Sequence, residues 1–384
     1  MIYLDNAATT RITKPVLDAM MPYLTEQYGN PSASYRLGRR AKQAIETARK
    51  QFAKAINAKP EQIFFTSGAT ESNNMVRRAF NGDYYCSPFE HPSMDNGSGY
   101  EIKNIYDELD GLENFKKVCE NRQSIENPTI RNNFLIACQY VNSETGYIFN
   151  IKELCALVHR YNYYFHCDMT AAFSHLDINI KDLNVDFASF SGHKFHAPKG
   201  VGVLYIKDPE KFKDRFDIIG GGQENGLRSG TENVASIVGL GTAAMRYNFG
   251  WSAERIMEYS RDLLINLLFK KMPCSYYVNI VDPDYHVSNI VSISIEGIEG
   301  DTIRAMLDTK GICISTGTAC HSKSLEVSNM IKAFHMPDNY NYGTIRISMS
   351  VETTEDEIET FVDELAECCR QLILLKGGGN NAGN

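Results

Sequence analysis

The sequence lacks the features that mark membrane-spanning, secreted and nucleic-acid-binding proteins. No apolar stretch approaches the roughly 20 residues that a helix needs to cross a bilayer. The first residues, Met1–Asp5, show no basic segment followed by an apolar core, so no secretion signal is expected. No run of Lys and Arg stands out, and the formal net charge is −8, which disfavours a surface built for nucleic acid or lipid. We therefore expect a cytoplasmic protein without direct contact with nucleic acid or membrane.

Paired cysteines are also missing. None of the ten cysteines forms a Cys-x-x-Cys pair, and Cys368 and Cys369 fall in a predicted helix, so no structural metal site is expected. Cys138, Cys167 and Cys313 lie in or beside apolar runs, where a free thiol behaves as a small apolar side chain. A large acidic chain without a secretion signal is typical of a reducing compartment, so a disulfide framework is not expected either.

The sequence does contain the composition and periodicity of a large α/β protein. Apolar residues make up 43% of the 384 residues and charged residues 22%, which is ordinary for a soluble chain long enough for two lobes. Apolar runs alternate with amphipathic helical stretches such as 38–55 and 151–161. The predicted buried strands are 63–66, 134–138, 164–167, 185–190 and 201–206. This alternation predicts an α/β fold with a mostly parallel central sheet.

The pattern changes after a helical stretch near 251–272. A strand at 290–295, a helix at 301–310, a strand at 345–349 and a helix at 354–375 follow, and together they indicate a smaller α+β domain. We predict a large domain over residues 14–250, a small domain formed by residues 1–13 and 251–375, and a disordered Gly- and Asn-rich tail over residues 376–384.

Candidate functional residues stand at the ends of the predicted strands, where open α/β sheets bind ligands. After the strand 63–66 comes Ser67-Gly68-Ala69-Thr70, in which glycine allows a tight turn and small residues begin a helix. The free N–H groups at such a helix start can bind a phosphate. Taken alone, the same residues are more typical of an ordinary capped helix than of a ligand site.

Three further strand ends strengthen the case for a ligand. A polar turn that contains Asn142 follows one strand. Asp168 ends the next, where it could cap a helix or hold a protonated ring nitrogen. Lys194 follows a third, and burial there disfavours a charged lysine but suits an amine that reacts with a carbonyl cofactor. Small Ser191 leaves space for such a cofactor, and Ser191 and His193 can donate to a phosphate.

Ordered motifs along nearly the whole chain, to about Leu365, make it similar to a known family. The motifs are Tyr3-Leu4-Asp5-Asn6-Ala7-Ala8-Thr9-Thr10, Gly29-Asn30-Pro31-Ser32, Phe65-Thr66-Ser67-Gly68-Ala69-Thr70-Glu71-Ser72, Ser191-Gly192-His193-Lys194, Arg228-Ser229-Gly230-Thr231 and Ser315-Thr316-Gly317-Thr318-Ala319-Cys320. On these motifs the chain resembles the pyridoxal-phosphate-dependent enzymes of fold type I, in the class V aminotransferase family. Within that family it is most similar to the group I (NifS/IscS-like) cysteine desulfurases. The resemblance implies a large domain with a mostly parallel sheet and a smaller α+β domain.

The resemblance also implies which residues hold the cofactor, pyridoxal 5'-phosphate. Lys194 would bind it covalently, Asp168 would hold its pyridine nitrogen, Asn142 would lie beside the ring hydroxyl and His91 would stack on the ring. The phosphate would be bound by Ala69, Thr70, Ser191 and His193 and, from the neighbouring subunit of a homodimer with shared active sites, by Thr231.

The resemblance further implies the substrate and the reaction. Asn30 and Arg346 would receive the carboxylate of L-cysteine, for which a planar guanidinium is well suited. Cys320 would take the sulfur as a persulfide, releasing L-alanine, and pass it to an acceptor such as an iron–sulfur scaffold or a thiolation enzyme. Lys194 and His91 would be the other catalytic residues. On residue chemistry alone, a reactive and a structural Cys320 are equally supported.

Other interpretations stay open at this point. A selenocysteine lyase or an aminotransferase could use the same scaffold, and a non-catalytic partner protein would be expected to lack Lys194. His91 could be a plain loop residue, and Arg346, which alternates with apolar residues on a predicted strand, could point to solvent. One position departs from the family: the glutamine expected three residues after Asp168, at the ring oxygen, is Ala171.

Overall fold

The computed structural model describes residues 1–81, 83–94, 112–125, 127, 133–246, 251–280, 282–316 and 327–379. The chain divides by contact into two compact units. The large unit comprises Thr10–Val141 and Phe149–Phe249, and the small unit comprises Met1–Thr9, Asn142–Ile148 and Gly250–Asn384.

Residues 142–148 group with the small unit although they lie inside the range 14–250 predicted for the large domain. Tyr147 forms a β-bridge with His286, and the N–H of Ile148 donates to the carbonyl of Tyr285 (2.8 Å). These contacts join positions far apart in the sequence, which is why the local pattern does not reveal them.

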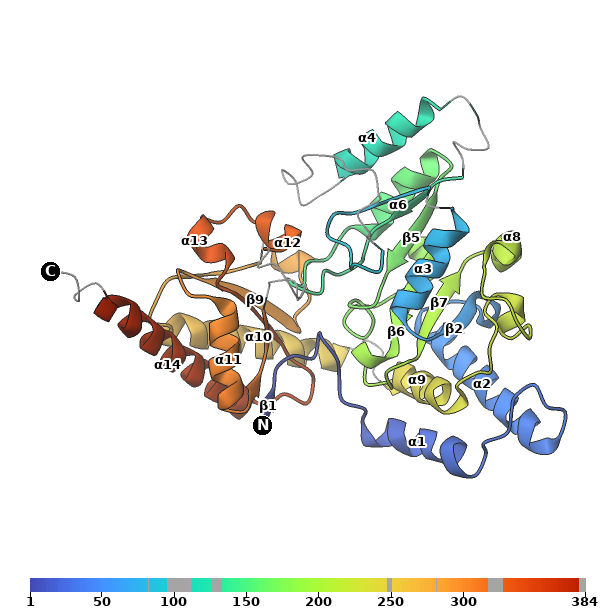
Figure 1. Ribbon diagram of the computed structural model, residues 1–384, viewed down its shortest axis with the longest axis horizontal. Coiled ribbons are helices and arrows are strands. Elements are labelled where there is room, and N and C mark those ends of the chain that lie inside the picture. Colours follow the sequence, from blue (N-terminus) through green and yellow to red (C-terminus); the bar gives the residue numbers. More distant parts are fainter. Residues whose placement is uncertain are drawn as a thin grey trace. The chain divides into compact units, whose positions relative to one another are not determined.

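A six-stranded sheet forms the centre of the large unit (Figure 1). In spatial order its strands are β2 (Ile63–Thr66), β7 (Gly202–Ile206), β6 (Phe187–Ser191), β5 (Tyr164–Asp168), β4 (Leu135–Ala137) and β3 (Tyr84–Cys86). Strands β3 to β6 run parallel, whereas β7 is antiparallel to both of its neighbours. The predicted α/β fold with a mostly parallel sheet is confirmed. Strand β3 was not predicted from the sequence, because its run of three residues is too short to show the alternation of side chains that marks a strand.

Helices cover both faces of this sheet. In β6, Phe187 and Phe190 point to opposite faces because side chains alternate along a strand. Phe187 contacts Phe80, which follows α3 (Ala69–Ala79), and Phe190 contacts Phe52 of α2 (Arg36–Ala55). Helices α1 (Lys14–Thr25) and α9 (Val234–Arg246) pack together beside α2 (Figure 1). The other helices of this unit are α4 (Leu112–Gln123), α6 (Ile151–Arg160), α7 (Ile180–Leu183) and α8 (Pro209–Phe212).

The small unit is built around a four-stranded antiparallel sheet. Its strands are, in spatial order, β11 (Ser315–Thr316), β12 (Thr344–Ser348), β9 (Ile290–Ile295) and β8 (Tyr276–Val278), and β1 (Ile2–Tyr3) pairs in parallel with β10 (Ile312–Cys313). Its helices are α10 (Trp251–Lys271), α11 (Gly300–Thr309), α12 (Asn329–Lys332), α13 (Asp338–Asn341) and α14 (Glu355–Gly379). Apolar side chains from the sheet, α10 and α14 form its core, where Ile293, Leu264 and Phe361 are fully buried.

Helix α14 is longer than the sequence predicts. The sequence predicts a disordered tail from residue 376, yet the helix continues to Gly379. The ammonium of Lys376 donates to the carbonyl of Gly297, which holds the last part of the helix against the unit. None of the helices in the described part of the chain is both long enough and apolar enough to pass through a lipid bilayer.

A buried ion pair joins α2 to the segment between α8 and α9 in the large unit. The guanidinium of Arg49 donates two hydrogen bonds of 2.8 Å to the carboxylate of Glu224, and the N–H of Phe65 donates to the same carboxylate (2.8 Å). The Arg49 and Glu224 side chains are only 10% and 3% exposed. Without Glu224, the buried Arg49 guanidinium would keep only the more exposed carboxylate of Glu46 as an ionic partner among the described residues.

Replacing Glu224 with alanine is therefore expected to lower the free energy of unfolding by about 3–5 kcal/mol, because a buried Arg49 loses its partner. Urea unfolding followed by circular dichroism measures the change. Glu46 is the matched control, since it contacts the same Arg49 at 3.3 Å but is 46% exposed. Its replacement with alanine is expected to cost less than about 1 kcal/mol. Equal losses in the two variants would contradict this account.

Candidate active site

Three of the predicted strand ends lie at one edge of the six-stranded sheet. Strand β7 is antiparallel to both β2 and β6, so β2 and β6 run in the same direction, and β5 is parallel to β6. Their carboxyl ends therefore meet at the same edge. Asp168 is the last residue of β5, and Gly68 and Lys194 lie in the segments that follow β2 and β6.

The start of α3 forms a cradle for an anion. Gly68 has φ +155°, and a Cβ at Gly202 would lie 2.5 Å from the Gly68 Cα, so two backbones approach closely here. No side chain caps the first N–H groups of α3 at Ala69 and Thr70. A Cβ placed on Gly68 would lie 3.6 Å from the Ser191 hydroxyl oxygen, which puts that hydroxyl beside the helix start. Backbone N–H groups, the helix dipole and nearby hydroxyls are the donor set that a phosphate requires.

The acidic residue in the first turn of α3 need not repel an anion bound at the helix start, because its charge is paired. Glu71 pairs with the guanidinium of Arg228 (2.7 Å) and accepts from the N–H of Ser67 (3.0 Å). Burial would raise the pKa of Glu71, but the hydrogen bonds from Arg228 and Ser67 outweigh it and lower the pKa. The Arg228 contact also anchors the loop that leads to Thr231, whose own side chain is exposed.

Asp168 is a buried carboxylate held by two hydrogen bonds. It is 8% exposed; Oδ1 accepts from the N–H of Thr170 (2.9 Å), and Oδ2 accepts from the amide nitrogen of Asn73 (2.8 Å). His166, two residues earlier on β5, bonds to the Ser189 hydroxyl (2.9 Å), and burial lowers its pKa to about 4 against the opposing charge of Asp168. His166 is thus a neutral neighbour at pH 7. A buried carboxylate is stabilised by a cationic partner, and a protonated pyridine nitrogen is one.

Lys194 lies in a short 3-10 turn, Gly192–Lys194, that is fixed to the chain before α1. The N–H and hydroxyl of Thr10 both donate to the carbonyl of His193 (2.8 and 2.9 Å), and the N–H of His196 donates to the Thr10 hydroxyl (2.7 Å). Lys194 is half-buried. Desolvation, with the charges of Lys194 and Lys199, lowers the pKa of His193 to about 4, so His193 is a neutral hydrogen-bonding group at pH 7.

His91 lies within electrostatic reach of both Asp168 and Lys194. Its Nδ1 is 2.8 Å from the Ser93 hydroxyl and accepts from the N–H of Ser93 (3.1 Å). Desolvation lowers the pKa of His91, opposed by Asp168 and reinforced by Lys194. His91 is exposed, and its role beside the cofactor stays a prediction.

The small unit holds two other predicted residues, Arg346 and Asn142. The Arg346 side chain is 11% exposed; it pairs with Asp5 (2.8 Å) and donates to the carbonyl of Ser143 (2.8 Å). The alternative of a strand arginine that points to solvent is wrong, since these partners hold the guanidinium inside. The Asn142 amide oxygen accepts from the N–H groups of Glu144 and Thr145 (3.0 Å each), which shapes the turn beside Arg346.

Sequence reasoning missed a buried acid in the same turn. The Glu144 carboxyl has one oxygen, Oε2, that is buried without a hydrogen-bond partner among the described residues. Burial raises the pKa of Glu144, opposed by a hydrogen bond from Ser328 and by the charge of Arg346. Asp5 and Asn73 were missed as well. A buried asparagine within a helix was a usable signal for Asn73, because asparagine disfavours helix interiors unless its amide is bonded elsewhere.

Two other predicted residues remain, Cys320 and Asn30. Cys320 lies outside the described residues, in the gap between 316 and 327. Asn30 is exposed, and its amide oxygen accepts from the N–H of Ser32 (2.9 Å) in a local turn.

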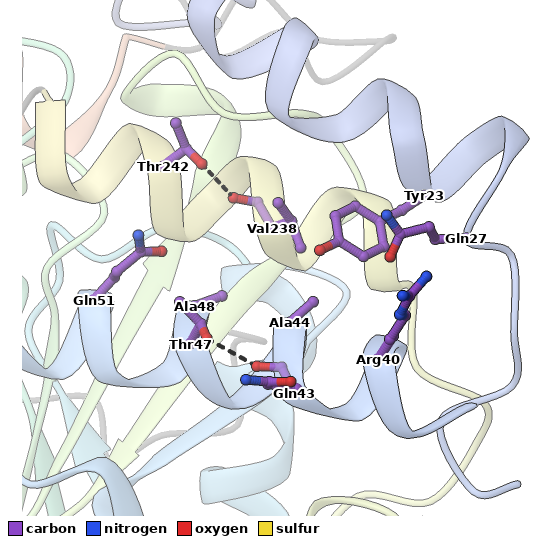
Figure 2. A pocket seen from close by; sticks show the side chains of 10 residues that line it. All are labelled: Tyr23, Gln27, Arg40, Gln43, Ala44, Thr47, Ala48, Gln51, Val238 and Thr242. Atoms are coloured by element: carbon purple, nitrogen blue, oxygen red, sulfur yellow. Dashed lines mark hydrogen bonds between the residues drawn. The ribbon is translucent and has the colours of Figure 1, made fainter. Parts of the chain in front are cut away.

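A separate hollow in the large unit contains none of the predicted residues. It has a volume of about 360 Å³ and lies among α1, α2 and α9 (Figure 2). Its lining is mostly neutral, with Gln43, Thr47 and Gln51 from α2 and one guanidinium, from Arg40. The residues that line it include no carboxylate, histidine or cysteine.

The chain was compared with known proteins. The model of the family "Aminotransferase class-V" matches residues 2–361. A cysteine desulfurase IscS of Methanosarcina thermophila is 36% identical over 385 residues, which covers 97% of this chain and 92% of that protein. A solved NifS-like protein has a TM-score of 0.83 at 30% identity, covering 96% of this chain and 99% of that one.

A structure of SspA in complex with cysteine has a TM-score of 0.75 at 30% identity and covers 92% of this chain and all (100%) of that one. Relatives and structures thus agree with the family match over nearly the full length. The chain belongs to the class V aminotransferase family, which depends on pyridoxal phosphate, and within that family to the IscS/NifS-like cysteine desulfurases.

Proposed function

We propose that this cysteine desulfurase takes sulfur from L-cysteine with Lys194 as the amine that holds pyridoxal phosphate and Cys320 as the first sulfur acceptor. The observation that carries the proposal is the sheet edge of the large unit, where an anion cradle, a buried carboxylate and a half-buried lysine follow three strands that end together. Each of these groups matches one part of the cofactor: phosphate, ring nitrogen and aldehyde.

The donor set of the large unit fits the cofactor. The N–H groups of Ala69 and Thr70, with the Thr70 and Ser191 hydroxyls and neutral His193, would bind the phosphate. Asp168 would pair with the ring nitrogen, and the accessible His91 ring would stack on the pyridine. When bound, pyridoxal phosphate supplies an aldehyde for the substrate amine and a ring that accepts charge from the α-carbon.

The remaining roles follow from proton and charge requirements. The Lys194 amine would remove the substrate α-proton, and His91 would be the group for proton transfer beside the substrate thiol. Arg346, held by Asp5 and Ser143, would receive the substrate carboxylate together with Asn30. The Asn142 amide oxygen is used in its turn, so the amide nitrogen is the group left to donate to the ring hydroxyl.

The Cys320 thiolate would attack the sulfur of the substrate, so that an S–S bond forms while the carbon–sulfur bond breaks. The electron pair of the broken carbon–sulfur bond stays on the substrate β-carbon. This carbon takes up a proton and becomes the methyl group of alanine, which is then released. The persulfide on Cys320 would then be passed to an acceptor protein, such as an iron–sulfur scaffold or a thiolation enzyme. Thr231 would bind the phosphate of the neighbouring subunit in a homodimer.

The direct test is the colour and the product of the purified protein after incubation with pyridoxal phosphate. We expect absorbance near the edge of the visible range that borohydride bleaches, and alanine release when L-cysteine is added. Screening 2-oxo acids as amino acceptors separates this activity from transamination. A protein that stays colourless and releases no alanine would contradict the proposal.

A further inference from the structure

We propose that Asn73 is a positioning residue that links the acid at the ring nitrogen, Asp168, to the imidazole of His91 through Ser93. The link is a continuous chain of hydrogen bonds. The Asn73 amide nitrogen lies 2.8 Å from Asp168 Oδ2 and 2.9 Å from the Ser93 hydroxyl oxygen, which in turn lies 2.8 Å from His91 Nδ1. This inference deepens the proposed function, because it rests on the roles given there to Asp168 and His91.

The direction of every hydrogen bond in this chain is fixed by the number of protons. The Asn73 NH2 group has two hydrogens, one for the carboxylate of Asp168 and one for the Ser93 oxygen. The opposite amide orientation would place the Asn73 oxygen against a carboxylate, where two acceptors repel. His91 Nδ1 accepts from the N–H of Ser93 (3.1 Å) and so carries no proton, which makes the Ser93 hydroxyl the donor in its contact with Nδ1.

This arrangement determines the tautomer of His91. A nitrogen that accepts two hydrogen bonds cannot carry the proton, so neutral His91 holds its proton on Nε2. The lowered pKa of His91 keeps the ring neutral at pH 7. The negative charge of Asp168 orients Asn73, Asn73 orients Ser93, and Ser93 leaves Nε2 as the proton-bearing atom of the ring.

Asn73 lies where it can connect three parts of the large unit: α3, the end of β5 and the turn after His91. It is fully buried on α3, the helix whose start forms the phosphate cradle, while Asp168 ends β5 and Ser93 belongs to the turn after His91. Its amide oxygen, buried without a partner among the described residues, costs stability that an apolar residue would not cost. That cost is offset by bonds that fix the phosphate cradle, the acid and the imidazole with respect to one another.

The test compares three variants of the cofactor-loaded protein: Asn73→Leu, Ser93→Ala and, as control, Asn74→Ala. The Asn74 amide contacts only the Thr70 and Ser93 carbonyls and the Arg77 side chain, and bonds to neither Asp168 nor the His91 ring in the described structure. The readouts are the dissociation constant of pyridoxal phosphate and the ¹⁵N resonances of His91, which report its tautomer. Neither readout depends on turnover.

Asn73→Leu is expected to raise the dissociation constant about tenfold or more, because a charged acceptor loses a donor, and to move the His91 resonances. Ser93→Ala is expected to move the His91 resonances while the dissociation constant stays within about twofold, since the Asn73–Asp168 bond remains. Asn74→Ala is expected to change neither readout.

The proposal fails if His91 resonances in Ser93→Ala match those of the unchanged protein, a result that does not depend on whether Asn73→Leu folds. It also fails if Asn73→Leu only lowers the melting temperature and leaves both readouts unaltered. Either outcome differs from a failure of the proposed function, in which the unchanged protein itself would bind no pyridoxal phosphate.

Discussion

Replacing Lys194 with alanine is expected to lower alanine production from L-cysteine on the order of 10³-fold or more, since the variant loses both the amine that holds the cofactor and the base at the α-carbon. The turn that carries Lys194 is fixed by the backbone and hydroxyl contacts of Thr10, so the variant should fold. Alanine is quantified under saturating pyridoxal phosphate and L-cysteine.

Lys199 offers the matched control for this experiment. It lies five positions further along the chain and is exposed. Lys199→Ala should keep its activity within about twofold, because its charge acts only on the pKa of His193, which desolvation lowers more strongly. Borohydride followed by peptide mapping should mark position 194 in the unchanged protein and in Lys199→Ala. Substantial alanine production by Lys194→Ala would remove this residue from the mechanism.

Replacing Cys320 with serine is expected to abolish persulfide formation and to reduce alanine release about 10²–10⁴-fold, because a hydroxyl is a far weaker nucleophile toward sulfur than a thiolate. The variant should still bind pyridoxal phosphate, and its cofactor absorbance should still respond to L-cysteine. Intact mass spectrometry after a single turnover should show one added sulfur atom in the unchanged protein and none in Cys320→Ser.

Cys274 provides the corresponding thiol control, since its side chain is partly accessible and lies in the same unit. Cys274→Ser should acquire the added sulfur atom and release alanine as the unchanged protein does. If Cys320→Ser produced alanine at the original rate, the sulfur would have to leave by a route that does not involve this cysteine. The same variant is suited to a pull-down of the acceptor protein, because it forms no persulfide and no sulfur is transferred while the complex is isolated.

Part of the candidate site could be predicted from the sequence, and part could not. The strand ends with Gly68, Asp168 and Lys194 could be predicted, because an apolar run followed by small or polar residues has a local physical meaning in an α/β sheet. The reversed direction of β7 could not, since a buried strand reads the same in either direction. The partners of Arg346 were equally hidden: its ion pair with Asp5 joins residues at opposite ends of the chain.

The sequence by itself determined the fold class, the order of the strand ends and the family, because these depend on periodicity and on motifs that are continuous in the chain. Only the tertiary structure decided that residues 142–148 group with the small unit and that Arg346 is held inside rather than exposed. Only the tertiary structure shows that Asn73 forms hydrogen bonds with Asp168, which is 95 positions away in the sequence, and with Ser93, which is 20 positions away. Hydrogen bonds of this kind form between side chains that folding brings together, so no local pattern encodes them.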